Sequence, residues 1–278
     1  MQKILIAING EELNEQALNF ACAIARIKAS PLTGIFLENL VENEQLIWKV
    51  TGGGNYPEWE IDERSKALAT KAKKITANIE KFRAICQANQ VACKVHEDKS
   101  VPVREMETES RFADLLILDA CMSFKEYTGT PSDLVQQILR HAECPVIIAP
   151  ESYTAINEII FMYDGSKNAA YAIKQFAYLF PELYDKRVIV FRIAEDGIWQ
   201  GPEREQMLEW LQQRYSAIGF EVQKGDVKDK MFDYLLKREN NIIVMGSYGR
   251  TALSRFFTHS DADFVINTIP RPLFISHI

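Results

Sequence analysis

Short, uninterrupted apolar runs alternate along this chain with stretches in which apolar residues recur at helical spacing. The opening run, Lys3–Gly10 (KILIAING), ends in Asn-Gly and leads into the helical pattern EELNEQALNFACAIARI. Strands that are covered by helices on both faces read as continuous apolar runs. Because strand and helix patterns alternate throughout, the sequence predicts an α/β fold with a parallel, doubly wound, Rossmann-like sheet.

This order of patterns occurs twice. The run Glu158–Gly165 (EIIFMYDG) repeats the opening run, with Gly165 in the place of Gly10, and again precedes a helical pattern. Two later pairs also match, namely Ala113–Ala120 (ADLLILDA) with Asn240–Ser247 (NNIIVMGS), and Cys144–Ala149 (CPVIIA) with Arg271–Ser276 (RPLFIS). Ordered landmarks that recur in this way predict two homologous domains in tandem.

The repeat also predicts where the domains lie. We expect the first at residues 1–150 and the second at 156–278, with the linker between them. The later pairs are closer together in sequence than the opening pair, so the first domain holds an insertion between these landmarks. We place it around 41–74, a region that contains GGGNYPEW and a long charged helical pattern with an apolar face.

In the second domain the patterns predict five strands in alternation with four helices. The predicted elements are Ile159–Tyr163, Ala169–Phe180, Arg187–Ile193, Pro202–Ile218, Phe220–Lys224, Lys228–Arg238, Ile242–Met245, Asp261–Thr268 and Leu273–Ile275. Doubly wound sheets bind ligands beyond the carboxyl ends of their strands, where the strand order reverses. We therefore look for a site where the first strand of each domain ends, at Asn9 or Asp164, and where the fourth ends, at Asp119 or Gly246.

The residues at these positions resemble those of a known family. The opening strand with Asp164-Gly165-Ser166, the segment IIVMGSYGRTALSRFF and the closing strand with Arg-Pro-Leu-Phe resemble a universal stress protein domain. The first half is similar in layout and weaker in motif. The whole chain thus resembles a tandem universal stress protein, and the resemblance implies a cytoplasmic stress-response protein that acts as a regulatory or binding module.

The resemblance also implies an adenine-nucleotide site in the second domain. Family members that bind nucleotide use an aspartate after the first strand and a Gly-x2-Gly-x9-Gly-Ser/Thr loop, whose glycines let backbone amides approach phosphate at the start of a helix. The matching positions and the residues between them are Asp164, Gly246, Ser247, Gly249, Arg250, His259 and Ser260. His259 stands where the third glycine belongs, so we expect at most weak binding of ATP or AMP.

The first domain departs further from the family pattern. Asn9 stands in place of the aspartate, and Asp119 and Met122 replace the first two glycines. Pro131 fills the position of the third glycine. Because a carboxylate at a phosphate site is unfavourable by its charge, we expect no nucleotide in the first domain.

Simpler interpretations of the same residues stay open. Gly246 and Gly249 also suit a tight connection between a strand and a helix without a ligand. Ser260 suits a helix N-cap, and Asp164 suits a cap or a turn with Gly165. The triplet His259-Ser260-Asp261 contains the residue types of a hydrolase triad, but neighbours in sequence do not face one another in triad geometry, and we predict no catalytic residue.

The composition of the chain argues against nucleic acid and membranes as binding partners. The chain has a formal net charge of −6, with 47% hydrophobic and 25% charged residues. Such an acidic chain lacks the basic surface of a nucleic-acid binder, and neither a membrane-spanning run nor a signal peptide is evident. The five cysteines are loosely spaced without a CxxC motif, which favours reduced, buried thiols in a cytoplasmic protein over disulfides or a metal site.

The resemblance implies one interaction within the chain. In this family the last strand of a domain pairs antiparallel with that of its partner, and both closing strands here, CPVIIAP and RPLFISHI, are apolar edges that would favour aggregation if left free. We expect the two halves to pack as a pseudo-dimer, with a homodimer or an unknown protein as further partners. Two functions remain as alternatives, a slow ATPase or phosphotransferase and a scaffold that binds protein without nucleotide.

Overall fold

The computed structural model describes residues 2–38, 58–97, 102–123, 132–194, 197–246, 266 and 270–276. The first half contains β1 (Ile4–Asn9), α1 (Glu15–Ile27), β2 (Leu32–Leu37), α3 (Glu58–Ala88), β3 (Cys93–Glu97), α4 (Pro102–Ser110), β4 (Leu115–Asp119), α5 (Asp133–His141) and β5 (Val146–Ala149). The second half contains β6 (Glu158–Met162), α6 (Lys167–Leu179), a 3-10 turn (Pro181–Leu183), β7 (Arg187–Ile193), α7 (Pro202–Gln212), β8 (Ile218–Gln223), α8 (Val227–Leu236), β9 (Asn241–Gly246) and β10 (Leu273–Ser276).

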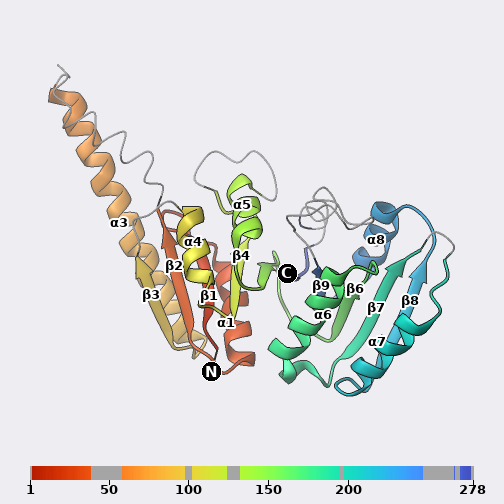
Figure 1. Cartoon of the computed structure of the whole chain (residues 1–278). Coiled ribbons are helices and arrows are strands. Elements are labelled where there is room, and N and C mark those ends of the chain that lie inside the picture. Colours follow the sequence, from red (N-terminus) through yellow and green to blue (C-terminus); the bar gives the residue numbers. More distant parts are fainter. Residues whose placement is uncertain are drawn as a thin grey trace.

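Ten strands of the described chain form one sheet, in the order β3-β2-β1-β4-β5-β10-β9-β6-β7-β8. Neighbouring strands within each half are parallel, and the halves meet where β5 pairs antiparallel with β10 (Figure 1). The order of the second half is the reverse of the first, as a pseudo-twofold relation requires. The predicted α/β fold and the pairing of the two closing strands are confirmed.

The strand register follows the sequence repeat. Ile4 of β1 is level with Leu115 of β4. The match of Gly10 with Gly165 makes Ile159 the equivalent of Ile4, and the match of Pro145 with Pro272 makes Ile242 the equivalent of Leu115. Ile159 and Ile242 are also level. The ends of β1 and β4 in one half therefore correspond to the ends of β6 and β9 in the other.

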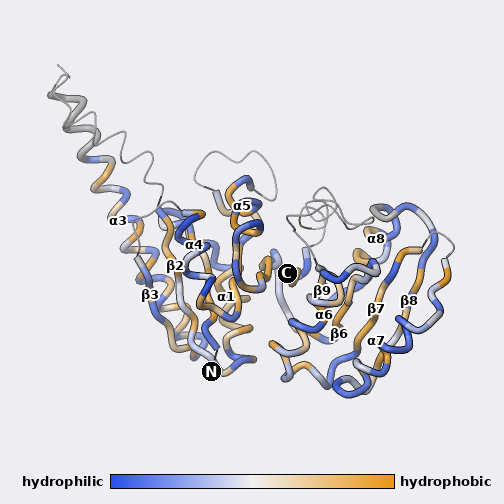
Figure 2. Tube along the Cα trace, in the orientation of Figure 1, coloured by the Kyte–Doolittle hydropathy of each residue, from blue (hydrophilic) through white to orange (hydrophobic). Residues whose placement is uncertain are grey.

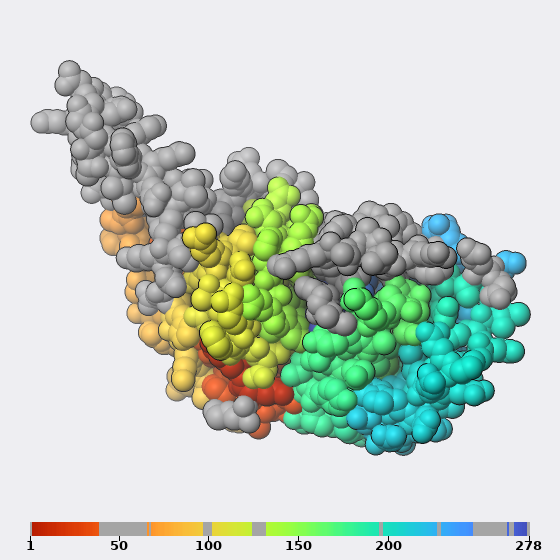
Figure 3. All heavy atoms as spheres, in the orientation of Figure 1, coloured from red at the N-terminus to blue at the C-terminus, as the bar shows by residue number. Residues whose placement is uncertain are grey.

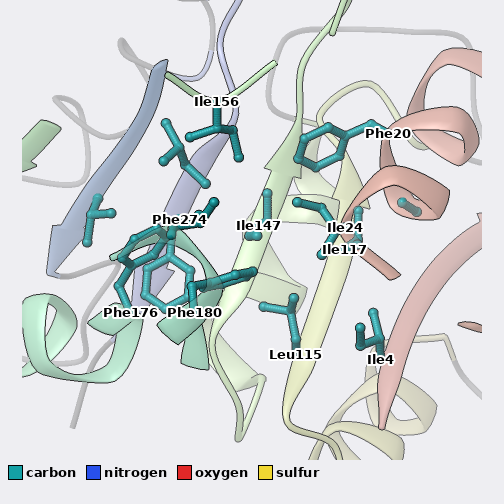
Figure 4. Close-up of a cluster of buried hydrophobic side chains, with 14 of the residues drawn as sticks. Ile4, Phe20, Ile24, Leu115, Ile117, Ile147, Ile156, Phe176, Phe180 and Phe274 are labelled. Atoms are coloured by element: carbon teal, nitrogen blue, oxygen red, sulfur yellow. The ribbon is translucent and has the colours of Figure 1, made fainter. Parts of the chain in front are cut away.

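Two hydrophobic layers cover the sheet, one on each face, and both run through the two halves. Strand residues point alternately to the two faces, so that Ile147 of β5 and Phe274 of β10 join the layer under α1, α3, α6 and α7. Ile148 and Ile275 join the layer under α4, α5 and α8. Figure 4 shows Phe274 near Ile147, together with Phe176 of α6 and Phe180, which follows that helix. Figure 2 shows apolar residues along the strands. The junction of the halves is thus part of the core.

An ion pair between a buried lysine and a partly exposed glutamate spans the junction on one face of the sheet. Lys28 follows α1, and its side chain is 4% exposed. Its Nζ donates to both carboxylate oxygens of Glu182, at 2.8 and 2.6 Å, and to the carbonyl of Leu179. Nζ also lies 5.4 Å from the centre of the Phe180 ring. Figure 3 shows the two halves meeting along a closely packed boundary.

Helix α3 is the main difference between the two halves. It has 31 residues, whereas α7, at the equivalent place in the second half, has 11. Its C-terminal part packs on the sheet through Ile75, Ile79 and Phe82, three positions of the predicted apolar face, and its N-terminal part extends beyond the sheet (Figure 1). Residues 39–57, most of the region before it, lie outside the described residues.

One predicted helix end is wrong by six residues, and another predicted helix lies largely outside the described residues. Helix α7 ends at Gln212, not at the predicted Ile218. The chain leaves the helix there because Tyr215, 2% exposed, turns into the core and packs edge-on against Phe161. The predicted helix over 261–268 falls, apart from Ile266, outside the described residues.

Candidate functional site

The strand order reverses once in each half, and the predicted site lies at that point in the second half. There β6 lies between β7 and β9, and parallel pairing brings the carboxyl ends of all three to one edge of the sheet. Asp164 follows β6 closely, and Gly246 is the last residue of β9. The structure therefore places two of the predicted residues on adjoining strand ends, as ligand sites in this class of sheet require.

Asp164 supports a turn that leads into α6. Its side chain is largely buried, and Oδ1 accepts the N–H of Ser166 at 2.9 Å. Gly165 between them has φ +83°, a conformation that costs glycine little. Ser166 is the N-cap and accepts the N–H of Ala169 at 3.1 Å, so that α6 begins at Lys167, two residues before the predicted start. Of the two simpler interpretations of Asp164, the turn is present and the cap is supplied by Ser166.

Gly246 allows α6 to lie directly on the end of β9. A Cβ at this position would come within 2.1 Å of the Asn168 carbonyl oxygen and 2.3 Å of the Ala169 nitrogen. These are backbone atoms of the first turn of α6, so a side chain here would force the helix away. The close packing accounts for this glycine without a ligand, and it also brings the start of α6 to the edge where an anion is expected.

The rest of the predicted loop is outside the described residues. This holds for Ser247, Gly249, Arg250, His259 and Ser260. Their contact with a nucleotide stays a prediction.

In the first half, the polar side chains at the equivalent point form hydrogen bonds within the protein. Asn9 donates from Nδ2 to the Ser123 carbonyl at 2.7 Å. Asp119 accepts the Asn14 amide on Oδ2 at 2.8 Å and the Cys121 N–H on Oδ1 at 3.0 Å. Polar groups that would face a ligand are engaged in this network.

The first half also differs in where its helix begins. Glu12 is the equivalent of Lys167, the first residue of α6, but α1 begins only at Glu15, which is about one turn later. Asn14 is its N-cap. A pocket of about 240 Å³ lies in the space between α1 and the strand ends, and Glu12 and Asp119 line it without any Lys, Arg or His among its described lining residues. The negative charge of these carboxylates makes phosphate binding in this pocket unfavourable.

Ser132, the first-half counterpart of Ser260, is a helix cap. Its Oγ accepts the N–H of Val135 at 3.2 Å at the start of α5 and donates to the carbonyl of Met122. In this half the serine at the position is structural.

A cluster beside Asp164 was not predicted from the sequence. Arg192, near the end of β7, has its guanidinium 5.0 Å from the centre of the Trp199 ring and donates to Glu203 at 3.2 Å. Tyr163 stacks on Trp199 with ring centres 5.1 Å apart and donates its hydroxyl to Glu203 at 2.5 Å. Burial and the bond to Glu203 raise the pKa of Tyr163. The sequence signal for this cluster is an arginine inside the apolar run RVIVFRI.

Neither a metal site nor a membrane span is found in the described part of the chain. No three His, Cys, Asp or Glu residues among those described are arranged to hold a metal ion. None of the described helices is long and apolar enough to cross a membrane.

Comparisons with known proteins show the fold. No family model matches the sequence, and no curated protein matches it. A universal stress protein from Archaeoglobus fulgidus DSM 4304 has a similar structure, with a TM-score of 0.68, 16% identity and 98% of each chain covered. A functionally unknown protein from Pseudomonas aeruginosa PAO1 is also similar, with a TM-score of 0.57, 14% identity, and coverage of 100% of this chain and 92% of that one. The fold of a universal stress protein thus extends over nearly the whole chain.

Proposed function

We propose that this chain is a tandem universal stress protein that acts in the cytoplasm as a regulatory or binding module, with one weak adenine-nucleotide site in its second domain. The site would take ATP or AMP at the ends of β6 and β9. Its contacting residues would be Asp164, Gly246, Ser247, Gly249, Arg250, His259 and Ser260. The shared fold supports the family, and the domain limits 1–150 and 156–278 belong to the same proposal.

One observation carries the choice of the second domain. Asp164 and Gly246 lie at the ends of adjoining strands at the point of reversal, and the start of α6 lies against Gly246. The unpaired N–H groups and the dipole at a helix start favour anions. The equivalent point in the first domain holds Asp119, whose carboxylate is bonded to Asn14.

A thermal-shift experiment on the full chain tests the proposal. A ligand that binds the folded state raises the melting temperature as its concentration rises. We expect a rise with millimolar Mg-ATP or AMP that Asp164→Asn removes and that Asp119→Asn, the matched change in the first domain, leaves intact. Asparagine keeps an oxygen for the Ser166 N–H, so the turn should survive. An unchanged melting temperature at millimolar nucleotide would refute the site.

The same samples separate binding from catalysis. Phosphate release that is no faster than in buffer, together with a thermal shift, supports a binding module. Release that Asp164→Asn abolishes would instead support the slow enzyme. A chain that shows neither effect would leave the protein-binding scaffold, for which the region around 41–74 is the proposed contact surface.

A further inference from the structure

Three of the five cysteines lie together where α1, α3 and β3 meet. Cys22 of α1 and Cys86 of α3 are fully buried, and their Sγ atoms are 3.9 Å apart. Cys93 begins β3, and its thiol also interacts with the thiol of Cys86. All three belong to the hydrophobic layer on one face of the sheet. Cys86 thus adjoins both of the other thiols.

Contacts between α1 and α3 keep the two buried thiols close together. Lys81 of α3 forms an ion pair with Glu15 of α1, with Nζ 2.5 Å from Oε1. Asn89, just after α3, donates from Nδ2 to the Asn19 Oδ1 of α1 at 3.1 Å. The sulfurs of a disulfide are about 2.05 Å apart. The two sulfurs, now at 3.9 Å, therefore need to approach by only about 1.9 Å to form one.

The three thiols differ in exposure and in charge. Cys93 is partly exposed, whereas Cys22 and Cys86 are buried, so an oxidant in solution meets Cys93 first. The hydrogen bond from Cys86 outweighs burial and, with the charge of Arg26, lowers the pKa of the Cys22 thiol. A thiolate is the nucleophile in thiol–disulfide exchange. The cluster thus combines an accessible thiol with a buried nucleophile, and Cys86 lies in contact with both.

We propose that Cys93, Cys86 and Cys22 form a thiol relay that reacts with hydrogen peroxide and ends in a disulfide between Cys22 and Cys86. The Cys93 sulfur attacks a peroxide oxygen and the O–O bond breaks, which gives a sulfenic acid and one water. The Cys86 sulfur displaces the hydroxyl, which leaves as water with the Cys86 proton. Cys22 then attacks the Cys86 sulfur, and Cys93 leaves as a thiol with the proton of Cys22. In total two thiols lose two electrons and two protons, and one peroxide becomes two waters.

The disulfide joins the sheet-packed part of α3 to α1. Cys22 and Cys86 are 64 residues apart, and the loop that the bond closes includes β2 and the predicted insertion around 41–74. Cytoplasmic thiols are kept reduced, so the bond forms under oxidation and is removed by reducing thiols. This inference goes beyond the proposed nucleotide site and does not depend on it.

Peptide mass spectrometry of the folded full chain after exposure to hydrogen peroxide tests the relay. The chain is then unfolded in iodoacetamide, which blocks every remaining thiol. We expect a linked peptide pair that contains Cys22 and Cys86 and that dithiothreitol separates. Cys93→Ser should slow its formation at least about tenfold, whereas Cys121→Ser, the same change at the exposed cysteine after β4, should leave the rate unchanged. In Cys22→Ala the reaction should stop one step earlier, at a disulfide between Cys86 and Cys93.

Melting curves accompany each sample. Curves of the reduced variants identify any that has lost its fold, and Cys93→Ala then replaces Cys93→Ser. The oxidised wild type should melt roughly 5 °C or more above the reduced protein, because the bond constrains the unfolded chain.

Three results would refute the relay. In the first, peroxide oxidises Cys121 while no linked peptides of Cys22 and Cys86 appear in the wild type. In the second, Cys93→Ser forms the bond as fast as the wild type. In the third, oxidation lowers the melting temperature, which would mean that the bond distorts the fold. None of these results bears on the nucleotide site, which is tested separately by the thermal shift with Mg-ATP or AMP.

Discussion

The ion pair between Lys28 and Glu182 should stabilise the chain very unequally through its two members. The ammonium is buried, with 4% of the Lys28 side chain exposed, whereas Glu182 is 39% exposed. Glu182→Ala leaves a buried charge with the Leu179 carbonyl and the face of Phe180. An unpaired buried charge costs about 3–5 kcal/mol, and we reduce this to about 2–3 kcal/mol because water reaches the Glu182 side.

The reverse change should cost much less. Lys28→Met removes the buried charge, keeps most of the side-chain volume, and leaves a carboxylate that water can solvate. Replacing the charge by an apolar side chain is expected to cost no more than about 1 kcal/mol. The double variant should then match Lys28→Met, because the cost of Glu182→Ala depends on the charge of Lys28.

Urea unfolding followed by circular dichroism measures these differences as shifts of the midpoint at constant slope. We expect Glu182→Ala to unfold at clearly lower urea than Lys28→Met. The reasoning is refuted if Lys28→Met is the more damaging change, or if the two single effects simply add in the double variant. Lys186→Met, at an exposed pair with Asp185, is the control and should change the midpoint little.

Three further predictions concern the site and the first half of the chain. Gly246→Ala should lower the free energy of unfolding by on the order of 2 kcal/mol or more, and the melting temperature by more than about 5 °C. The reason is that the alanine Cβ would collide with the α6 backbone. An unchanged melting temperature would contradict the close packing. Cys144 is partly buried, and desolvation raises the pKa of its thiol to about 12. It should therefore react with iodoacetamide at pH 8 far more slowly than exposed Cys121. Peptide mass spectrometry measures both rates, and equal rates would contradict the raised pKa. Burial opposes ionisation of Glu109, but the bonds from Lys3 and His96 outweigh it and lower its pKa below 4.5. The stability that the ionised Glu109 contributes is therefore present above about pH 4.5 and lost as pH falls further. Glu109→Gln should make the urea midpoint depend less on pH between about pH 3 and 5. An unchanged pH dependence would contradict this role of Glu109.

The repeat made the sheet predictable from the sequence. It relates Ile4 and Leu115 to Ile159 and Ile242, and the members of each pair are level in the structure. Continuous apolar runs indicated strands covered on both faces, and the family resemblance, together with the uncharged closing strands, indicated that these strands pair. These features depend on the order and composition of segments, which a sequence states directly.

Side-chain contacts between distant parts of the fold could not be predicted from the order and composition of segments. Helix α1 starts late in a half where Asp119, not glycine, ends β4, and Asp119 lies 105 residues from the Asn14 cap that it binds. The convergence of Arg192 and Tyr163 on Glu203 depends on how α7 packs against the sheet, where it contacts β8. The end of α7 depends on Tyr215 entering the core. In each case the cause is a packing partner that is distant in sequence.

The antiparallel pairing of β5 with β10 has a consequence for how the two halves differ. In a symmetric homodimer every substitution appears twice, once on each side of the axis. Here the two sides of the pseudo-axis are encoded separately, while covalent linkage keeps them together at any concentration. The first half can therefore carry Asp119 where the second half has Gly246. In the first half, hydrogen bonds within the protein engage the polar groups at the strand ends, whereas in the second half Gly246 packs against α6. The single chain thus has the architecture of a dimer, but equivalent positions in its two halves can carry different residues.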